Sequence, residues 1–517
     1  MKRRIGAGLL AGALLLTGCA AGSDRHTGAR ADHGAPDRAA PDRAAPDGAA
    51  PPTASRAPGA AEAPDRLSTF ALDVDTASYG YARRALAEGR LPDPADVRPE
   101  EFVNSFRPDY PRPKDNGFSV TVDGARSDAA GWSLVRVGLA TRPSDGERPP
   151  AALTFVVDVS GSMAEPGRLD LVKESLGLLA DRLRDDDSVA LVTFSSKAET
   201  VLPMTRVEGN RERLHDLVDA LATSSSTNVE AGVRTGYDVA VEGHRKGATN
   251  RVVLLSDALA NTGDTDAEGI LERIDEERRA YGITLFGVGV GSEYGDAFME
   301  KLADKGDGTT TYVSTPGQAR KVFVDQLPGH VELRARDAKA QVAFDPKTVK
   351  RFRLIGYENR EVADEDFRDD RVDGGEIGAG HTVTALYAVE LRPGASGRVA
   401  TATVRWLDPA TRAPHERSGT VDTAALAAPI WGDGHDSLQL TAIAAYFADR
   451  LRGGSVPGAP ALSGLAARAG ALAERARSAS VRELAEAIRR ADGLGAPDAG
   501  SAATDPATDP DPDPYAG

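Results

Sequence analysis

The stretch Leu153-Thr154-Phe155-Val156-Val157-Asp158-Val159-Ser160-Gly161-Ser162 decides the fold of this chain. Its first half is an almost wholly apolar run, and its second half carries one carboxylate and two hydroxyls. An apolar run without polar alternation predicts a strand that is covered on both faces, as in a parallel sheet. Such sheets bind ligands in the loops at the carboxyl ends of their strands. We therefore expect Asp158 and the two serines after it to belong to a binding site.

Residues 151–328 repeat this pattern, with short apolar strands separated by amphipathic helices. The predicted strands are 153–157, 189–194, 200–202, 251–255, 283–290 and 310–313, and the predicted helices are 169–183, 211–221, 229–240, 267–279, 296–303 and 318–327. This alternation predicts an α/β domain of Rossmann-like type, in which a mainly parallel sheet carries helices on both faces.

Three loops of this domain place oxygen ligands at one edge of the predicted sheet. The first loop contributes Asp158, Ser160 and Ser162, the second Thr227 and the third Asp257. Oxygen ligands without His or Cys suit a hard divalent cation, with Mg²⁺ favoured and Mn²⁺ or Ca²⁺ as alternatives. Two carboxylates and three hydroxyls fill its coordination shell incompletely, so a carboxylate from a partner can complete it. The alternative is that the two aspartates only cap helices or turns.

These loops resemble the metal-ion-dependent adhesion site of the von Willebrand factor type A fold, which has a D-x-S-x-S loop, a Thr loop and an Asp loop. The resemblance covers residues 151–328 with the loops in the same order. It implies a divalent cation held by the five residues above and a protein partner that offers an acidic residue. It implies binding rather than catalysis, with no small-molecule cofactor.

Two departures from the family pattern lie beside these loops. Ala258 stands where the family usually has Gly, and Val229-Glu230 stands where small residues are usual. Thr227 and Glu230 have the spacing of a capping box, and we expect Glu230 to take that structural role at the start of the next helix. A Glu230 that faced the metal would instead compete with the carboxylate of a partner.

The segments on either side extend the resemblance. Residues 65–150 contain Ser68-Thr69-Phe70-Ala71-Leu72-Asp73-Val74-Asp75, and residues 329–495 contain Arg353-Leu354-Ile355-Gly356-Tyr357-Glu358-Asn359-Arg360. Both resemble flanking domains of a bacterial lipoprotein family, with an extra N-terminal domain before the type A domain and a β-rich, partly helical domain after it. Strand-like runs at 118–139 and 331–425 are expected to share one sheet system, with the type A domain inserted between them. Helices are expected at 436–452 and 461–491.

The first 19 residues have the pattern of a lipoprotein signal peptide. Lys2, Arg3 and Arg4 precede an apolar run too short to span a membrane, and Leu16-Thr17-Gly18-Cys19 closes that run. The tetrad resembles the bacterial lipobox, which implies lipidation of Cys19 and anchorage to the cell membrane on its extracytoplasmic face. The alternatives are an ordinary signal peptide or an uncleaved anchor with an incidental cysteine.

Two segments have a composition that cannot form a packed core. Residues 20–64 consist largely of Ala, Pro, Asp, Arg and Gly, and residues 496–517 carry Asp-Pro repeats. Chains with so few large apolar residues bury too little surface to offset their conformational entropy. We therefore expect a disordered linker and a disordered acidic tail.

Charge and cysteine content exclude several classes of function. The net charge of −16 and the lack of basic stripes argue against binding of nucleic acid. A single cysteine excludes an intramolecular disulfide and a cysteine-based zinc cluster.

One alternative function is enzymatic. Asp73-Val74-Asp75-Thr76 resembles the nucleophile loop of haloacid-dehalogenase-like phosphatases, with Asp73 as the phosphorylated residue and Asp75 as general acid or base. That family has its Thr two residues after the second Asp, where this chain has Ala77. We favour an interpretation in which the two aspartates cap the turn from Thr76 to Tyr79, and we expect no enzymatic activity.

Other candidate motifs have structural interpretations. Gly287-Val288-Gly289-Val290-Gly291 lacks the spacing of a dinucleotide-binding loop, and its small residues are expected to let a strand end pack under helices. His381 and His435 lie outside the three metal loops and are expected to be hydrogen-bonded structural groups.

Overall fold

The computed structural model describes residues 66–497 except 73, 145–147, 258–269, 271, 273–279, 292–298, 300–301, 304–308, 327–328, 330 and 373. All described residues belong to one compact unit, Ala63–Gly517. The predicted signal peptide with Cys19, the predicted linker, most of the predicted tail, Asp73 and Ala258 lie outside the described residues. Within the described part of the chain, no helix combines the length and the apolar character needed to cross a membrane.

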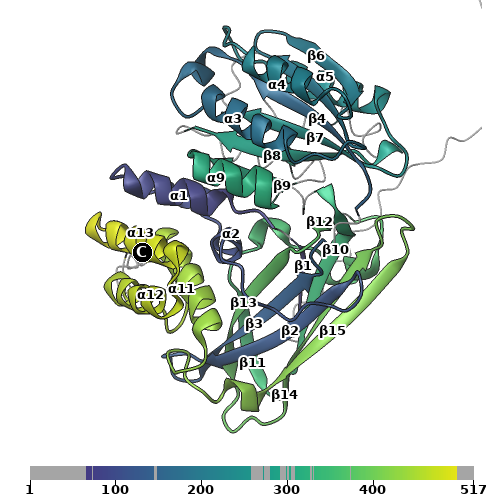
Figure 1. Cartoon of the computed structure of the whole chain (residues 1–517). Helices are drawn as coiled ribbons and strands as arrows, with labels where there is room; N and C mark the ends of the chain where they lie inside the picture. Colours follow the sequence, from purple (N-terminus) through teal and green to yellow (C-terminus); the bar gives the residue numbers. More distant parts are fainter. Residues whose placement is uncertain are drawn as a thin grey trace, which may run out of the picture. The chain divides into compact units, whose positions relative to one another are not determined.

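Residues 151–328, called the type A domain below because of the resemblance noted above, contain a six-stranded sheet in the order β6-β5-β4-β7-β8-β9 (Figure 1). All neighbouring strands run parallel except β6, which pairs antiparallel with β5 at the edge. The strands are β4 (Ala151–Asp158), β5 (Ser188–Phe194), β6 (Ala198–Arg206), β7 (Thr249–Ser256), β8 (Thr284–Val290) and β9 (Thr309–Val313). The predicted mainly parallel sheet is therefore confirmed.

Helices cover both faces of this sheet, which explains the apolar strands. On β4, Phe155 and Val157 point into a core shared with α3, α4 and α9, whereas Val156 points into a second core shared with α5. The helical segments are α3 (Leu169–Ala180), α4 (Arg211–Asp219), α5 (Val229–Glu242), α9 (Pro316–Arg320) and the π-helical turn η3 (Lys321–Gln326). The helices predicted at 267–279 and 296–303 fall mostly outside the described residues.

Two antiparallel sheets form a sandwich beside the type A domain. One has the order β1-β10-β14-β15 with β12 also paired to β10, and the other has the order β11-β13-β3-β2. The strands are β1 (Leu67–Ala71), β2 (Phe118–Arg126), β3 (Trp132–Thr141), β10 (Leu333–Phe344), β11 (Val349–Leu354), β12 (Gly375–Gly378), β13 (Thr382–Leu391), β14 (Arg398–Leu407) and β15 (Pro414–Asp422). Apolar residues from both sheets share one core, in which Phe344 packs on Phe352 and Tyr387.

The type A domain is inserted into this sandwich. β3 precedes it and pairs over nine residues with β13, which follows it. β1 likewise pairs with β10 across the insertion. The expectation that strands before and after the type A domain share one sheet system is confirmed.

Helices from both ends of the described chain form a third body against the sandwich. Their core includes α1 (Ala77–Ala87), α2 (Pro99–Asn104), α11 (Asp436–Leu451), α12 (Leu462–Ala476) and α13 (Ala479–Gly493). The helical stretch predicted at 461–491 is present and is divided into two helices, α12 and α13. Arg477 adopts a left-handed conformation (φ +49°) that ends α12, and the hydroxyl of Ser478 then accepts a hydrogen bond from Val481 N and caps α13. Short 3₁₀ turns complete the elements: η1 (Pro94–Asp96), η2 (Gly161–Ala164), η4 (Glu358–Arg360), η5 (Asp364–Arg368) and η6 (Thr423–Leu426).

Asp75 joins the N-terminal segment to the type A domain. Its buried carboxylate accepts hydrogen bonds from Thr310 N (2.7 Å) and Thr310 Oγ1 (3.1 Å) on β9. The sequence suggested a cap of the turn from Thr76 to Tyr79. The structure adds a long-range role for this carboxylate on β9, while Thr76 is the N-cap residue of α1.

A second link joins β7 of the type A domain to the sandwich. Arg251 Nη2 on β7 donates to Glu376 Oε2 on β12 at 2.9 Å, and both side chains are almost fully buried.

Candidate metal centre

Asp158 ends β4 with both carboxylate oxygens engaged. Oδ1 accepts a hydrogen bond from Ser160 N (2.8 Å), and Oδ2 accepts one from Ser256 Oγ (2.6 Å). The first bond closes a tight turn that brings the following serines back over the strand end. Register explains the second bond, because β4 and β7 run side by side with Val157 opposite Leu255. Asp158 is therefore held rigidly at the carboxyl edge of the sheet, where a parallel sheet binds its ligands.

The serines of the first loop lie together above this edge. Ser160 is the N-cap of η2, and its hydroxyl lies 3.0 Å from that of Ser162. Two adjacent hydroxyls beside a buried carboxylate present only oxygen atoms, the donor type that hard divalent cations prefer.

Asp257 lies one residue beyond the end of β7 and is fully buried. Its Oδ2 accepts a hydrogen bond from Arg168 Nη1 (2.8 Å), whereas its buried Oδ1 has no hydrogen-bond partner among the residues that the structure describes. A buried carboxylate oxygen without a donor is costly, and a cation is one group that satisfies it. This unsatisfied oxygen is the feature of the structure that fits a metal ion.

The loop that carries Thr227 lies against the first loop. Ser224 N donates to Val159 O (2.6 Å), and Asn228 N donates to Ser195 O (2.8 Å). Thr227 is buried between the two anchoring bonds. The structure thus brings the loops of Asp158, Thr227 and Asp257 to the same edge of the sheet.

The capping-box prediction for Thr227 and Glu230 is wrong. The N-cap of α5 is Asn228, whose side-chain oxygen accepts a hydrogen bond from Ala231 N (2.9 Å). Ser226, at φ +67°, turns the chain so that the cap falls one residue later than the sequence pattern indicates.

The pKa of Asp158 is raised to about 6. Burial is the main cause, because it disfavours the charged form, and the nearby carboxylate of Asp257 adds repulsion. Hydrogen bonds from Ser256 and Ser160 oppose the rise. A desolvated carboxylate beside a second one gains more from a cation than a solvated carboxylate does.

The site contains few acidic groups. Across the described residues, no group of three or more His, Cys, Asp or Glu side chains is arranged to hold a metal ion. A metal held here would therefore depend on two carboxylates supplemented by hydroxyls, and this donor set stays a prediction.

Sequence reasoning missed two residues of this site. Ser256 supports Asp158, and Arg168 bridges Asp257 to the first loop by donating from Nη1 to Ser162 O (3.0 Å) as well. The position of Ser256, directly before Asp257 at a strand end, was an available signal. No local pattern marks Arg168, which reaches Asp257 across 89 residues of sequence.

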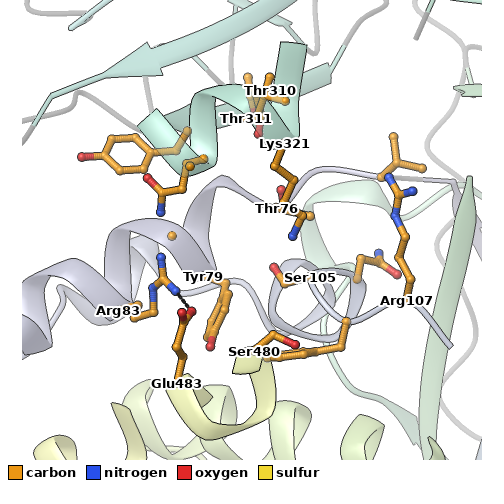
Figure 2. Close-up of a pocket in the computed structure, with 18 of the residues that line it drawn as sticks. Thr76, Tyr79, Arg83, Ser105, Arg107, Thr310, Thr311, Lys321, Ser480 and Glu483 are labelled. Carbon is orange, nitrogen blue, oxygen red and sulfur yellow. Dashed lines mark hydrogen bonds and ion pairs between the residues drawn. The ribbon is translucent and has the colours of Figure 1, made fainter. Parts of the chain in front are cut away.

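A separate polar pocket of about 450 Å³ lies where α1, β9, η3, β13 and α13 meet. Figure 2 shows hydroxyl groups of Thr76, Ser105 and Ser480 among its lining residues and an ion pair between Arg83 on α1 and Glu483 on α13. None of the five predicted metal ligands lines this pocket. The candidate metal centre and the pocket are therefore different sites.

Family models match three parts of the chain. Residues 152–325 match the von Willebrand factor type A domain, residues 54–135 match a model described as von Willebrand factor, and residues 331–425 match the C-terminal domain of the uncharacterized protein YfbK. Together with the parallel sheet and the loops at its edge, the central match shows that the chain carries a von Willebrand factor type A domain.

The chain is similar to the uncharacterized protein YfbK of Escherichia coli, with 37% identity over 63% of this chain and 58% of that protein. It is also 28% identical to human inter-alpha-trypsin inhibitor heavy chain H3 over 35% of this chain and 21% of that protein. The chain thus spans less than two thirds of either relative. A solved structure of a von Willebrand factor type A protein from Catenulispora acidiphila covers 76% of this chain and 99% of that chain, with 15% identity and a TM-score of 0.44.

The phosphatase alternative gains no support from these matches. Asp73, the residue that would be phosphorylated, lies outside the described residues. Asp75 is buried and bonded to Thr310, so it serves the junction between segments.

Proposed function

We propose that this protein binds a partner through a divalent cation held by Asp158, Ser160, Ser162, Thr227 and Asp257. Type A domains typically mediate protein binding or adhesion and commonly bind divalent metal, and proteins that contain them are mostly not enzymes. The observation that supports the proposal is the buried Oδ1 of Asp257, which has no hydrogen-bond partner in the described part of the chain, together with the hydrogen-bonded carboxylate of Asp158. Mg²⁺ suits this all-oxygen donor set, and Mn²⁺ and Ca²⁺ share its preference.

The proposed ligands have two different roles. Asp158 and Asp257 supply negative charge, and the hydroxyls of Ser160, Ser162 and Thr227 supply neutral oxygen donors. When bound, the cation supplies a Lewis-acidic position that accepts a further oxygen ligand. Because the protein contributes only two carboxylates, we infer that this further ligand is an acidic side chain of a protein partner.

The proposed place of action is the extracytoplasmic face of the cell membrane. The lipobox-like tetrad that ends at Cys19 supports a lipid anchor, and the Pro-rich residues 20–64 support a spacer between that anchor and the folded unit. Replacement of Cys19 by Ala should move the protein from the membrane fraction to the soluble fraction of the cell envelope. Unchanged membrane association of that variant would contradict the lipid anchor.

Calorimetric titration of the full chain with Mn²⁺ and Mg²⁺ tests the metal site. Asp158→Ala and Asp257→Ala should abolish metal binding, whereas Asp216→Ala, an exposed residue of α4, serves as the matched control and should bind as the wild type does. Pull-down from envelope extracts with and without EDTA then tests the partner. Metal binding that survives both substitutions would exclude these loops as the binding site.

A further inference from the structure

Arg168 places a buried positive charge inside the candidate metal centre. The residue lies between η2 and α3, and its side chain is only 2% exposed. Its guanidinium donates from Nη1 to Asp257 Oδ2 (2.8 Å) and to Ser162 O (3.0 Å). On the outer side, Nη2 lies 2.7 Å from Oε2 of Glu165, a side chain that is 60% exposed. The centre therefore contains a cation of its own before any metal ion binds.

Packing fixes this guanidinium in place. Gly291, at the end of β8, has φ +97°, and a Cβ there would lie 2.7 Å from Nε and 2.9 Å from Cγ of Arg168. Gly291 O also accepts a hydrogen bond from Arg84 Nη1 of α1 (2.6 Å), which holds this strand end against the helix. A glycine is required where the arginine lies closest to the backbone. Arg168 is thus enclosed on both sides instead of extending into solvent.

The charge of Arg168 changes what a bound metal ion offers to a partner. Asp158 and Asp257 alone would neutralise a divalent cation. With Arg168 beside Asp257, the buried groups of the loaded centre carry a net positive charge, because Glu165, the other carboxylate beside Arg168, is 60% exposed and its charge is screened by water. A guanidinium stays charged at any pH at which proteins are folded, so this contribution is permanent.

We propose that Arg168 is a fixed counter-cation of the metal centre, which weakens metal binding and makes the loaded centre selective for a carboxylate over a neutral ligand. This inference rests on the proposed function of the site. Repulsion between the guanidinium and the metal ion lowers metal affinity, and the same excess positive charge attracts an anionic ligand in a poorly solvated environment. Arg168 is thus the specificity-determining residue of the centre.

A purely structural role makes the opposite prediction. If Arg168 only tied Asp257 to the first loop, its removal would loosen both loops and weaken metal binding. If its charge matters, removal leaves two buried carboxylates without a counter-cation, and metal binding tightens. The sign of the change therefore separates the two roles.

Binding of Mn²⁺ to the full chain, measured by calorimetry and by electron paramagnetic resonance, is the test. Arg168→Met should lower the Mn²⁺ dissociation constant at least about tenfold, whereas Arg168→Lys, which keeps the charge, should stay within about threefold of the wild type. Glu165→Gln removes a negative neighbour of Arg168 and should weaken Mn²⁺ binding about twofold. Thermal unfolding should show a larger Mn²⁺-induced stabilisation for Arg168→Met than for the wild type.

Carboxylate selectivity is measured on the Mn²⁺-loaded proteins with N-acetylglutamate, and N-acetylglutamine is the neutral control. The wild type should prefer the carboxylate, and Arg168→Met should lose that preference. Equal or weaker Mn²⁺ binding by Arg168→Met, with binding by the wild type intact, would overturn the role of Arg168 and leave the metal site standing. A wild type that binds no Mn²⁺ would overturn the site and this inference together. If Arg168→Met does not fold, Mn²⁺ binding by Glu165→Gln serves as the test. Tighter or unchanged Mn²⁺ binding by that variant would overturn the inference.

Discussion

The type A domain and the sandwich around it treat buried charge differently. In the sandwich, Lys339 is buried, and its ammonium group donates to the carbonyl oxygens of Asp366 (3.5 Å), Asp369 (2.6 Å) and Val372 (2.6 Å). In the type A domain, Asp257 is equally buried, but none of the described residues donates a hydrogen bond to its Oδ1. A buried charge whose hydrogen bonds are made needs no further ligand, whereas a buried oxygen without a hydrogen bond can gain free energy when a ligand binds to it. The comparison therefore separates a structural charge from one available for function.

The two regions also differ in how the sequence builds them. The sheet of the type A domain uses strands from one continuous segment, residues 151–313. The sandwich instead pairs β3 with β13 and β1 with β10, so its strands come from both sides of that segment. Pairings across so long an insertion carry a large loop-closure cost until the inserted domain has folded. Interactions between the two regions are therefore expected to contribute to the unfolding free energy of both.

Breaking the ion pair between Arg251 and Glu376, which joins the two regions, should give the largest loss of unfolding free energy among these predictions. Glu376→Gln leaves the fully buried guanidinium of Arg251 without its carboxylate and should cost about 3–5 kcal/mol of unfolding free energy. Urea denaturation measures the loss. Arg251→Met combined with Glu376→Gln should be less destabilising than the sum of the single changes, because no unpaired charge stays buried. Additive losses would show that the pair does not couple the two regions.

His381 should make the stability of the sandwich sensitive to acid. Burial lowers the pKa of this imidazole to about 3, and Arg107 and Arg251 add repulsion. The unfolded chain takes up the proton first, near pH 6.5, so the stabilisation from His381 is complete above that pH and is lost as pH falls toward 3. Relative to His381→Gln, the wild type should lose about 2 kcal/mol between pH 7 and pH 5. A difference between the two proteins that does not vary with pH would contradict this assignment.

The smallest expected change in stability comes from Asn228, and comparison with Thr227 distinguishes a helix cap from a metal ligand inside the type A domain. Asn228→Ala removes the hydrogen bond to Ala231 N and should cost about 1 kcal/mol while Mn²⁺ affinity stays near that of the wild type. Thr227→Ala should weaken Mn²⁺ binding instead. Calorimetric titration and thermal unfolding of the two variants measure both properties. Equal Mn²⁺ affinity in Thr227→Ala would remove Thr227 from the set of proposed ligands.

Periodicity predicted a mainly parallel α/β domain, and the resemblance of its loops to a known family implied the type A fold. Its strands are apolar on both faces because helices cover both, so β4 and β7 were recognisable without a partner strand. Asp158 and Asp257 come at the ends of parallel strands, which indicated a common edge because parallel strands bring their carboxyl ends together, whereas Thr227 follows a helix and joined the set through the family resemblance. Strand-like patterning on either side of this segment likewise predicted the shared sandwich.

Only the tertiary structure decided which of these polar groups have hydrogen-bond partners and which residues those partners are. The partners of Asp75 and Asp257 lie far along the chain, at Thr310 and Arg168, and hydrogen bonds of that kind leave no periodic trace in sequence. The capping box failed for a related reason, because the left-handed turn at Ser226 gave the cap to Asn228. The sequence by itself determined the loops and the donor atoms of this site. The packing around Arg168 and Gly291 decided its charge, because long-range contacts, not local propensity, bury a cation beside Asp257.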